Sequence, residues 1–271
     1  MPFAVRLFAP AILTAGLALS LAACNTTRGD VTGALNARAS VEPAAAPRSE
    51  SEWRRSQEIW GERYRKNPGD AQAAITYARA LRATGQHAQA VAVLEQATLR
   101  QPKSMPLLAA YGRALADAGQ YAQALDALSR AHTPDNPDWH ILNAQGAVLD
   151  QLGRHPEARR HYEAALRIMP GEASVLSNLG LSYALTKDLK LAEETLRKAA
   201  GRPDSTPRVR QNLALVVGLE GRYAEAERIA SADLPPEEAE ANVRYLRDML
   251  DKQTSTKKNG RPVGLSPDAG G

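Results

Sequence analysis

The chain has 271 residues, of which 44% are apolar and only 5% aromatic, which is enough material for one large domain or a solenoid. Its 34 basic and 30 acidic side chains are interspersed and leave a net charge of +4. This mild excess, with no RNA- or DNA-binding motif and no alternation of basic and aromatic residues, argues against a nucleic-acid partner. One cysteine excludes an internal disulfide.

Residues 1–23 have the layout of a secretory signal peptide. Arg6 precedes an apolar run, and small residues close the segment. As a membrane span the run is short and is interrupted by Gly and Pro. It ends in Leu21-Ala22-Ala23-Cys24, which resembles the lipobox of bacterial lipoproteins, where the cysteine receives a diacylglycerol and cleavage occurs just before it. We therefore predict lipidation at Cys24; the alternative is an ordinary signal peptide with an incidental cysteine.

The residues after Cys24 bear on where the protein resides. In the lipoproteins that this segment resembles, Asp next to the lipidated cysteine usually signals retention in the inner membrane. Asn25 stands at that place, so the resemblance implies the outer membrane, with the protein facing the periplasm. Residues 24–50 are rich in Ala, Thr, Ser, Pro and Gly and have no apolar periodicity, which predicts a flexible tether.

From residue 51 to residue 252 the sequence follows a period of 34 residues. At one phase of this period, four of the five repeats have glycine: Gly85, Gly119, Gly153 and Gly221. The fourth repeat has Lys187 at this phase. Alanines mark a second phase without a gap: Ala90, Ala124, Ala158, Ala192 and Ala226. A 34-residue period with Gly and Ala at fixed phases is typical of the tetratricopeptide repeat (TPR), a unit of two helices joined by a turn.

This pattern predicts an all-α fold, a right-handed TPR superhelix. The five full repeats are expected at 71–104, 105–138, 139–172, 173–206 and 207–240. A half repeat that begins at Ser51 is expected before them, and a capping helix at 236–252 is expected to cover the open core. Residues 253–271 are rich in Lys, Gly, Pro and Ser, which predicts a disordered tail.

The small residues of each repeat predict how its two helices pack. Gly112, Gly146 and Gly180 stand in the middle of the first helix of the second, third and fourth repeats. Because a glycine has no side chain, the second helix can approach closely there, and larger apolar residues fill the remaining space. At the turn phase, Lys187 lacks the tolerance of glycine for positive φ, a cost of about 1 kcal/mol.

The sequence contains no constellation that carries catalysis. It has no Walker loop, no Gly-x-Ser-x-Gly and no His-Glu-x-x-His motif. The five histidines show no paired ligand spacing, so no metal site is predicted. We therefore expect a protein without enzymatic activity and without a cofactor.

The concave groove of a TPR array is lined by residues of the first helix that lie between the packing positions. Eight such residues are candidates for peptide contacts: Arg79, Arg82, Arg113, Asn143, Asn178, Arg208, Gln211 and Asn212. Asn178 and Asn212 share one phase and resemble the asparagine ladder of some TPR grooves, where the amide donates to and accepts from a peptide backbone. The alternative is that these are ordinary solvated polar positions, and for the arginines a carboxylate contact is possible.

The region from about Trp53 to Leu250 resembles one family more closely than TPR proteins in general. The resemblance lies at 144–150, 176–185 and 211–216 and in a closing helix with Asn242-Val243-Arg244-Tyr245-Leu246. These segments are similar to the TadD group of Flp-type (Tad, tight adherence) pilus assembly proteins. The resemblance implies a pilotin-like factor that helps the outer-membrane secretin, or another Tad component, to localise or assemble.

Two alternatives to this function stay open at the level of the sequence. One is a periplasmic TPR adaptor lipoprotein that recruits a peptidoglycan hydrolase or a protease. The other is a pilotin of another type IV pilus or of a type II secretion-like system. All three functions require protein partners and a lipid anchor in the membrane, and none requires a nucleic acid.

Overall fold

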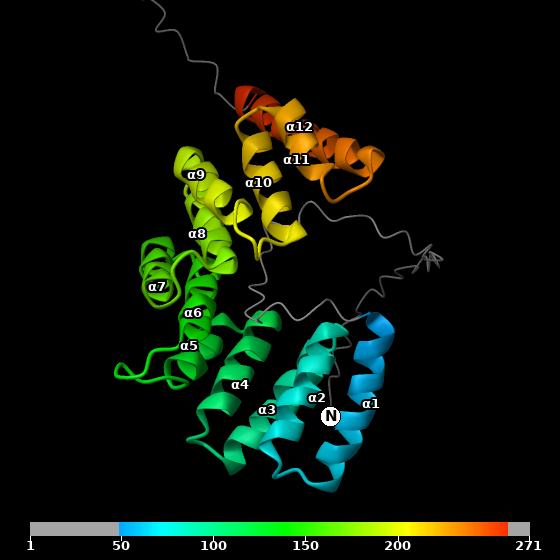
Figure 1. The fold of residues 1–271 in the computed structure, drawn as a ribbon, viewed down its shortest axis with the longest axis vertical. Coiled ribbons are helices and arrows are strands. Elements are labelled where there is room, and N and C mark those ends of the chain that lie inside the picture. Colours follow the sequence, from blue (N-terminus) through cyan, green and yellow to red (C-terminus); the bar gives the residue numbers. More distant parts are fainter. Residues whose placement is uncertain (1–48, 260–271) are drawn as a thin grey trace, which may run out of the picture.

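The computed structural model describes residues 49–259, so the predicted signal peptide, Cys24, the tether up to residue 48 and the segment 260–271 lie outside the described residues. The predicted all-α class is confirmed: residues 49–259 form twelve helices and no strand (Figure 1). The helices are α1 Glu50–Lys66, α2 Ala71–Ala83, α3 His87–Arg100, α4 Met105–Asp117, α5 Tyr121–Ser129, α6 Trp139–Gln151, α7 His155–Ile168, α8 Ala173–Leu185, α9 Leu189–Ala200, α10 Pro207–Leu219, α11 Tyr223–Ala230 and α12 Pro236–Asn259.

The helices form five hairpins that stack into a superhelical solenoid. The first helices of the hairpins (the A helices) are α2, α4, α6, α8 and α10, and the second helices (the B helices) are α3, α5, α7, α9 and α11. The A helices begin at the residues where the 34-residue period places the repeat starts. The array curves, so that α1 at one end and α11 and α12 at the other lie on the same side of an open centre (Figure 1).

In the second, third and fourth hairpins, the A helix lies so close to the B helix that no side chain fits between them at one position. A Cβ added at Gly112 would lie 2.6 Å from Leu128 Cγ, and one added at Gly180 would lie 2.6 Å from Leu196 Cγ. On the B helices, the alanines of the second phase are fully buried: Ala90, Ala124, Ala158, Ala192 and Ala226. Small residues on both helices therefore allow the close packing.

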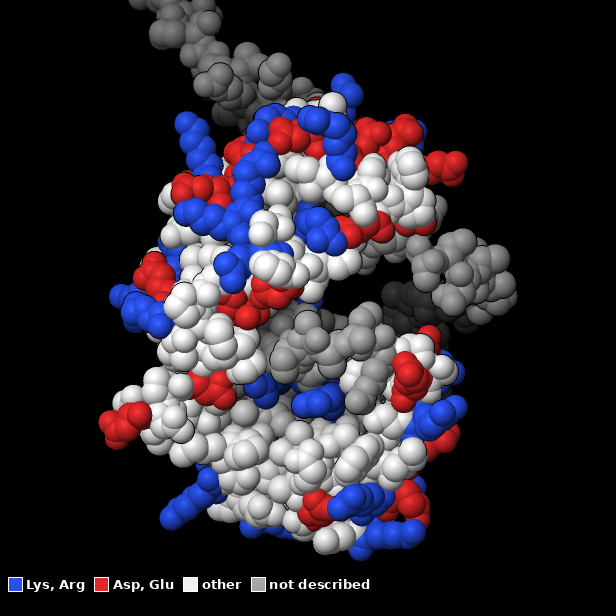
Figure 2. Space-filling model, viewed as in Figure 1, with Lys and Arg blue, Asp and Glu red and all other residues white. Residues whose placement is uncertain are grey.

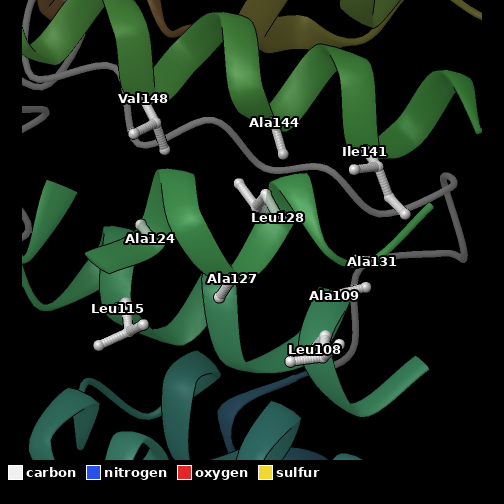
Figure 3. Packing of buried hydrophobic residues seen from close by; sticks show 10 residues of the cluster. All are labelled: Leu108, Ala109, Leu115, Ala124, Ala127, Leu128, Ala131, Ile141, Ala144 and Val148. Carbon is white, nitrogen blue, oxygen red and sulfur yellow. The ribbon is translucent and has the colours of Figure 1, made fainter. Parts of the chain in front are cut away.

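Apolar clusters join each hairpin to the next. One cluster takes Leu115 from α4, Leu128 from α5, and Ile141 and Val148 from α6, together with alanines of all three helices (Figure 3). Leu128 lies beneath Ala144 of α6, so the residue that packs on Gly112 also contacts the following repeat. The core is thus continuous from one repeat to the next, as a solenoid requires.

The turns inside the hairpins need a backbone that bends into the left-handed region. The four turn glycines have φ between 73° and 83°, and Lys187 has φ 66° in the turn between α8 and α9. The backbone hydrogen bond that closes the turn at Lys187 is equivalent to that of a glycine turn. Asp188 N donates to Tyr183 O at 3.0 Å, as Gln86 N does to Leu81 O at 2.8 Å in the first hairpin. Lys187 therefore takes the glycine conformation at the energetic cost expected for a residue with a Cβ.

The two ends of the array depart from the regular pattern. Helix α11 stops at Ala230, and Asp233, which stands where the other repeats have alanine, accepts two hydrogen bonds from Arg210 of α10, at 2.5 and 2.6 Å. Helix α12 buries Ala239 and Leu246 against the last hairpin and covers its open side.

The predicted boundaries need correction at both ends of the TPR region. Helix α12 continues to Asn259, so residues 253–259 of the segment predicted to be disordered are helical. The reason is local, because the sequence has neither Gly nor Pro between Pro236 and Gly260. At the other end, Ser49 caps α1 with a capping box, which makes Glu50, predicted as tether, the first helical residue.

The positive φ at Lys187 leads to a prediction about the stability of the folded protein. Lys187→Gly should raise the free energy of unfolding by about 1 kcal/mol, because glycine adopts φ 66° without steric cost. The control is Arg160→Gly, an exposed position inside α7, which should lower it by about 1 kcal/mol. Urea unfolding followed by circular dichroism measures both, and equal losses for the two variants would contradict the prediction.

Candidate protein-binding site on the concave face

The surface that faces the open centre is formed by A helices. Helices α7 and α9 lie on the outer side, whereas α6, α8 and α10 face the opening (Figure 1). In the same view the space-filling surface is hollowed between the two ends of the array, and basic side chains lie on the wall formed by α2 and α4 (Figure 2). We call the side of the A helices that faces the open centre the concave face.

The arginines of α2 and α4 have different environments. Arg82 Nε donates to Asp117 Oδ2 at 2.6 Å, and the two side chains are only 14% and 12% exposed. This ion pair joins the first two repeats, so the charge of Arg82 serves the stacking of α2 and α4. Arg79 is exposed and Arg113 is half-buried.

The asparagines of the predicted ladder bind each other across the repeats. Asn212 Nδ2 donates to Ser177 Oγ at 3.0 Å, and Asn178 Nδ2 donates to Asn143 Oδ1 at 2.9 Å. Asn143 and Asn212 are buried, whereas Asn178 is half-buried. These amides therefore hold α6, α8 and α10 together. A direct contact of Asn178 or Asn212 with a peptide stays a prediction.

The structure thus divides the eight predicted residues into two groups. Arg82, Asn143 and Asn212 are largely buried and bonded between repeats. The other five are exposed or half-buried: Arg79, Arg113, Asn178, Arg208 and Gln211. Arg208 and Gln211 lie on α10, at the opposite end of the concave face from Arg79. The second group supplies the side chains that a partner can reach.

The sequence analysis missed a polar cluster around Asp150, whose side chain is 7% exposed. Its carboxylate accepts hydrogen bonds from Tyr162 OH at 3.0 Å, Ser182 Oγ at 2.8 Å and His155 Nδ1 at 2.9 Å. The cluster joins α6, α7 and α8. One signal could have revealed it: Tyr162 stands at the phase where the first, second and fourth repeats have leucine, and a buried tyrosine hydroxyl needs a hydrogen-bond partner.

The environment of Tyr162 keeps its hydroxyl protonated. Complete burial raises the pKa of this phenol well above its usual value, and the neighbouring carboxylate of Asp150 raises it further. The hydroxyl therefore remains a donor to Asp150 at any physiological pH. The cluster therefore joins three helices through hydrogen bonds to one carboxylate.

Residues 49–259 offer no group of three or more His, Cys, Asp or Glu side chains placed to hold a metal ion. His161 on α7 is half-buried, and burial, together with nearby His132, lowers its pKa. Among the described helices, none combines the length and the apolar character needed to span a membrane.

Comparisons with known families agree with this architecture. Residues 139–202 match the family described as "Tetratricopeptide repeat", and residues 55–131 match the family described as "Anaphase-promoting complex, cyclosome, subunit 3". The chain is a TPR protein. Both matches lie inside the array, and TPR arrays present their concave faces to other proteins. No curated protein sequence matches this TPR protein.

Solved structures show the same fold. TTC0263, a thermophilic TPR protein of Thermus thermophilus, is 25% identical with a TM-score of 0.58, over 66% of this chain and 99% of that one. PilW, described as a widely conserved type IV pilus biogenesis factor, is 16% identical with a TM-score of 0.62, over 71% of this chain and 91% of that one. At such identity, the likeness to PilW shows the fold alone.

The hydrogen bond between Asn212 and Ser177 leads to a prediction about the stability of the stacked repeats. Asn212→Ala should lower the free energy of unfolding by about 1–2 kcal/mol, because it leaves a buried hydroxyl without its partner. A double-mutant cycle with Ser177→Ala, measured by urea unfolding, should give a favourable coupling energy of about 1 kcal/mol. Additive effects of the two substitutions would show that the bond contributes nothing to stacking.

The hydrogen bonds of Asp150 lead to a second prediction about the free energy of unfolding. Asp150→Ala removes the acceptor of three buried or half-buried donors and should cost about 3 kcal/mol. The matched control is Asp126→Ala on α5, whose carboxylate is exposed and pairs with Arg130 at 3.4 Å; this change should cost less than about 0.5 kcal/mol. A similar loss for both variants in thermal or urea unfolding would refute the structural role of Asp150.

Proposed function

We propose that this protein is a lipid-anchored periplasmic scaffold that assists the assembly of a pilus machine. Three observations support the proposal: the TPR array, the lipobox-like sequence that ends in Cys24, and the fold shared with PilW over 91% of that protein. PilW is described as a type IV pilus biogenesis factor. The observation that carries the proposal is the combination of this fold with a lipoprotein-like N-terminal sequence in one chain.

The membrane anchor is proposed at Cys24. Lipoproteins of the kind that this N-terminus resembles carry more than one acyl chain, and each buried methylene contributes about 0.8 kcal/mol, so the anchoring is stable. Residues 25–48 separate Cys24 from the cap of α1 at Ser49. This predicted tether allows the array to work at a distance from the membrane surface. With Asn25 after the lipidated cysteine, we place the protein in the outer membrane, facing the periplasm.

The machine that we propose is the Flp (Tad) pilus system, because of the resemblance to the TadD group. In that system the protein would bind a segment of the secretin or of another Tad component on its concave face. The role is that of a pilotin-like factor or of a later assembly factor, without catalysis. The similarity to PilW also favours a second candidate, the same role in another type IV pilus system.

The anchor is tested with Cys24→Ala. We expect the variant to fold, as judged by circular dichroism, but to leave the outer-membrane fraction and to abolish or strongly reduce piliation. Asn25→Asp is a matched variant that keeps the lipid; it should move the protein to the inner membrane. Unchanged fractionation and piliation with Cys24→Ala would refute the anchoring.

The partner is tested by cross-linking in cells, followed by purification of the protein and mass spectrometry. Secretin subunits or other pilus components among the products would support the proposed function. A peptidoglycan hydrolase or a protease in their place would support the alternative, an adaptor that recruits an enzyme. Normal pili in a strain that lacks the gene would refute a role in pilus assembly.

A further inference from the structure

The turn between α8 and α9 differs in composition from the turns of the other four hairpins. We call it the leucine–lysine turn, and it comprises Leu185, Thr186, Lys187, Asp188, Leu189, Lys190 and Leu191. At the phase of Leu191 the other repeats have polar residues: Gln89, Gln123, Glu157 and Glu225. At the phase of Lys190 they have uncharged residues: Ala88, Ala122, Pro156 and Ala224. With Lys187 in place of glycine, these departures bring apolar and basic side chains together at one turn.

The leucines of this turn are directed to the surface. Leu185 and Leu191 are 40% and 42% exposed, and Leu189 is half-buried. Leu152, the residue that ends α6 in the neighbouring repeat, is 38% exposed. Since α6 and α8 pack side by side, both end at the edge of the array that carries the turns inside the hairpins. This edge therefore presents leucines from two neighbouring turns, and a group of exposed apolar side chains marks an interaction site.

The two lysines of the turn are not neutralised by an ion pair. Lys187 and Lys190 are exposed, and within residues 49–259 neither side chain forms an ion pair or a hydrogen bond. Asp188 is the only acidic residue of the turn. Arg159 of α7 adds a third positive charge next to it, because its guanidinium donates to Thr186 Oγ1 at 3.3 Å. The surface around the leucines is thus positively charged.

The backbone of Lys187 is an independent sign of a role for this turn. Glycine adopts φ 66° without steric cost, and the other four turns have glycine there. The side chain of Lys187 contributes no bond to the fold in return. Residues with such strained backbone conformations cluster at functional sites. The role of this lysine therefore lies in a contact outside the folded array.

We infer that the leucine–lysine turn, together with Leu152, rests on the surface of an anionic phospholipid membrane. The leucine side chains enter the boundary between the headgroups and the acyl chains, and the ammonium groups of Lys187 and Lys190 bind headgroup phosphates. The long lysine side chains allow the charges to reach the headgroups while their methylene groups lie along the apolar region. This inference rests on the lipid anchor of the proposed function and adds the orientation of the array on the membrane.

A membrane surface fits the composition of this turn better than a protein partner does. The energy of protein interfaces comes mainly from Trp, Tyr and Arg, and lysine is depleted there. Residues 185–191 contain no aromatic residue and no arginine. Tyr183 and Arg159 lie beside the turn but contact each other, with the guanidinium 5.2 Å from the ring centroid. Leucine combined with lysine is instead typical of surfaces that bind anionic membranes.

The proposed anchor compensates for the small area of this contact. A few leucines and lysines bind a membrane only weakly by themselves, whereas a lipid chain combined with a basic patch binds stably. As a flexible chain, the predicted tether at 25–48 spans about 25–30 Å on average. The anchor therefore holds the turn at a high effective concentration near the surface, where a weak contact is enough to orient the array.

The inference is tested on vesicles with an artificial tether that does not depend on lipidation. The chain from residue 24 onward carries Cys24→Ser and an N-terminal histidine tag that binds a nickel-chelating lipid. Because Cys24 is the only cysteine, a new cysteine can be labelled selectively with the environment-sensitive fluorophore NBD. The label is placed by Leu191→Cys or, at the same phase of the first repeat, by Gln89→Cys, which is also exposed.

With vesicles that contain phosphatidylglycerol, NBD emission at residue 191 should rise about twofold and shift to shorter wavelength, because the fluorophore enters the headgroup boundary. Emission at residue 89 should stay unchanged. With vesicles of phosphatidylcholine and the chelating lipid alone, the rise at residue 191 should be much smaller. Equal emission changes at the two sites, or no change at residue 191, would overturn the inference.

Charge-reversal variants test the lysines. In the protein labelled at residue 191, Lys187→Glu with Lys190→Glu should abolish the rise in emission. The matched control is Lys103→Glu with Arg167→Glu, which changes the net charge equally at two exposed positions on the opposite edge, where the hairpins are linked. This control should keep the rise. Equal losses for the two double variants would show that net charge alone attracts the protein and would refute a contact by the turn.

Lys187→Gly separates the side chain of Lys187 from its backbone strain. We expect this variant to be more stable, as predicted above, and yet to show a smaller rise in emission at residue 191. Circular dichroism verifies the fold of every variant. An undiminished rise in the more stable variant would refute the proposed use of this lysine.

These measurements are independent of the fractionation and pilus assays. If Cys24→Ala fractionates unchanged, the proposed anchor fails, while the tagged protein still reports whether the turn contacts a membrane. If Cys24→Ala leaves the outer membrane but the label at residue 191 does not respond to vesicles, the anchor stands and the orientation of the array on the membrane is refuted.

Discussion

The structure depends on the close contact between each A helix and its B helix. At Gly146 an added Cβ would lie 2.5 Å from Tyr162 Cε1, and Tyr162 cannot move away because it is buried and bound to Asp150. Since glycine leaves no side chain between the two helices in the second, third and fourth hairpins, these hairpins are thin, and the residue that covers the glycine can also reach the next repeat, as Leu128 does. The packing inside one hairpin thus also positions the following one.

Polar contacts complement this apolar packing at the junctions between repeats. Apolar side chains, mostly alanine and leucine, fill the junctions, and the hydrophobic contacts that they make are not directional. A buried hydrogen bond such as that of Asn212 with Ser177 restricts it strongly, because any other rotation leaves both groups without partners. Arg82 and Asp117 act similarly between α2 and α4. We conclude that much of the polar chemistry of the A helices determines the curvature of the array.

The difference between packing inside one hairpin and contacts between hairpins explains what the sequence could and could not predict. The start of α6 at Trp139 and the left-handed backbone of Lys187 follow from the period, because they are properties of one repeat. The burial of Asn212 and the contacts of Asp150 depend on how neighbouring repeats are rotated against each other. A period gives the phase of a residue but not the residue that lies opposite in the next repeat. Helix α12 exceeded its predicted length because composition alone suggested disorder.

The contacts between repeats also limit which residues can recognise a partner. A substitution at Asn212 disturbs the stacking of α10 on α8, so its effect on binding is inseparable from its effect on the fold. Gln211, by contrast, is exposed on α10 and lies outside the hydrogen-bonded junctions described above. Recognition can therefore change at this position while the array keeps its shape.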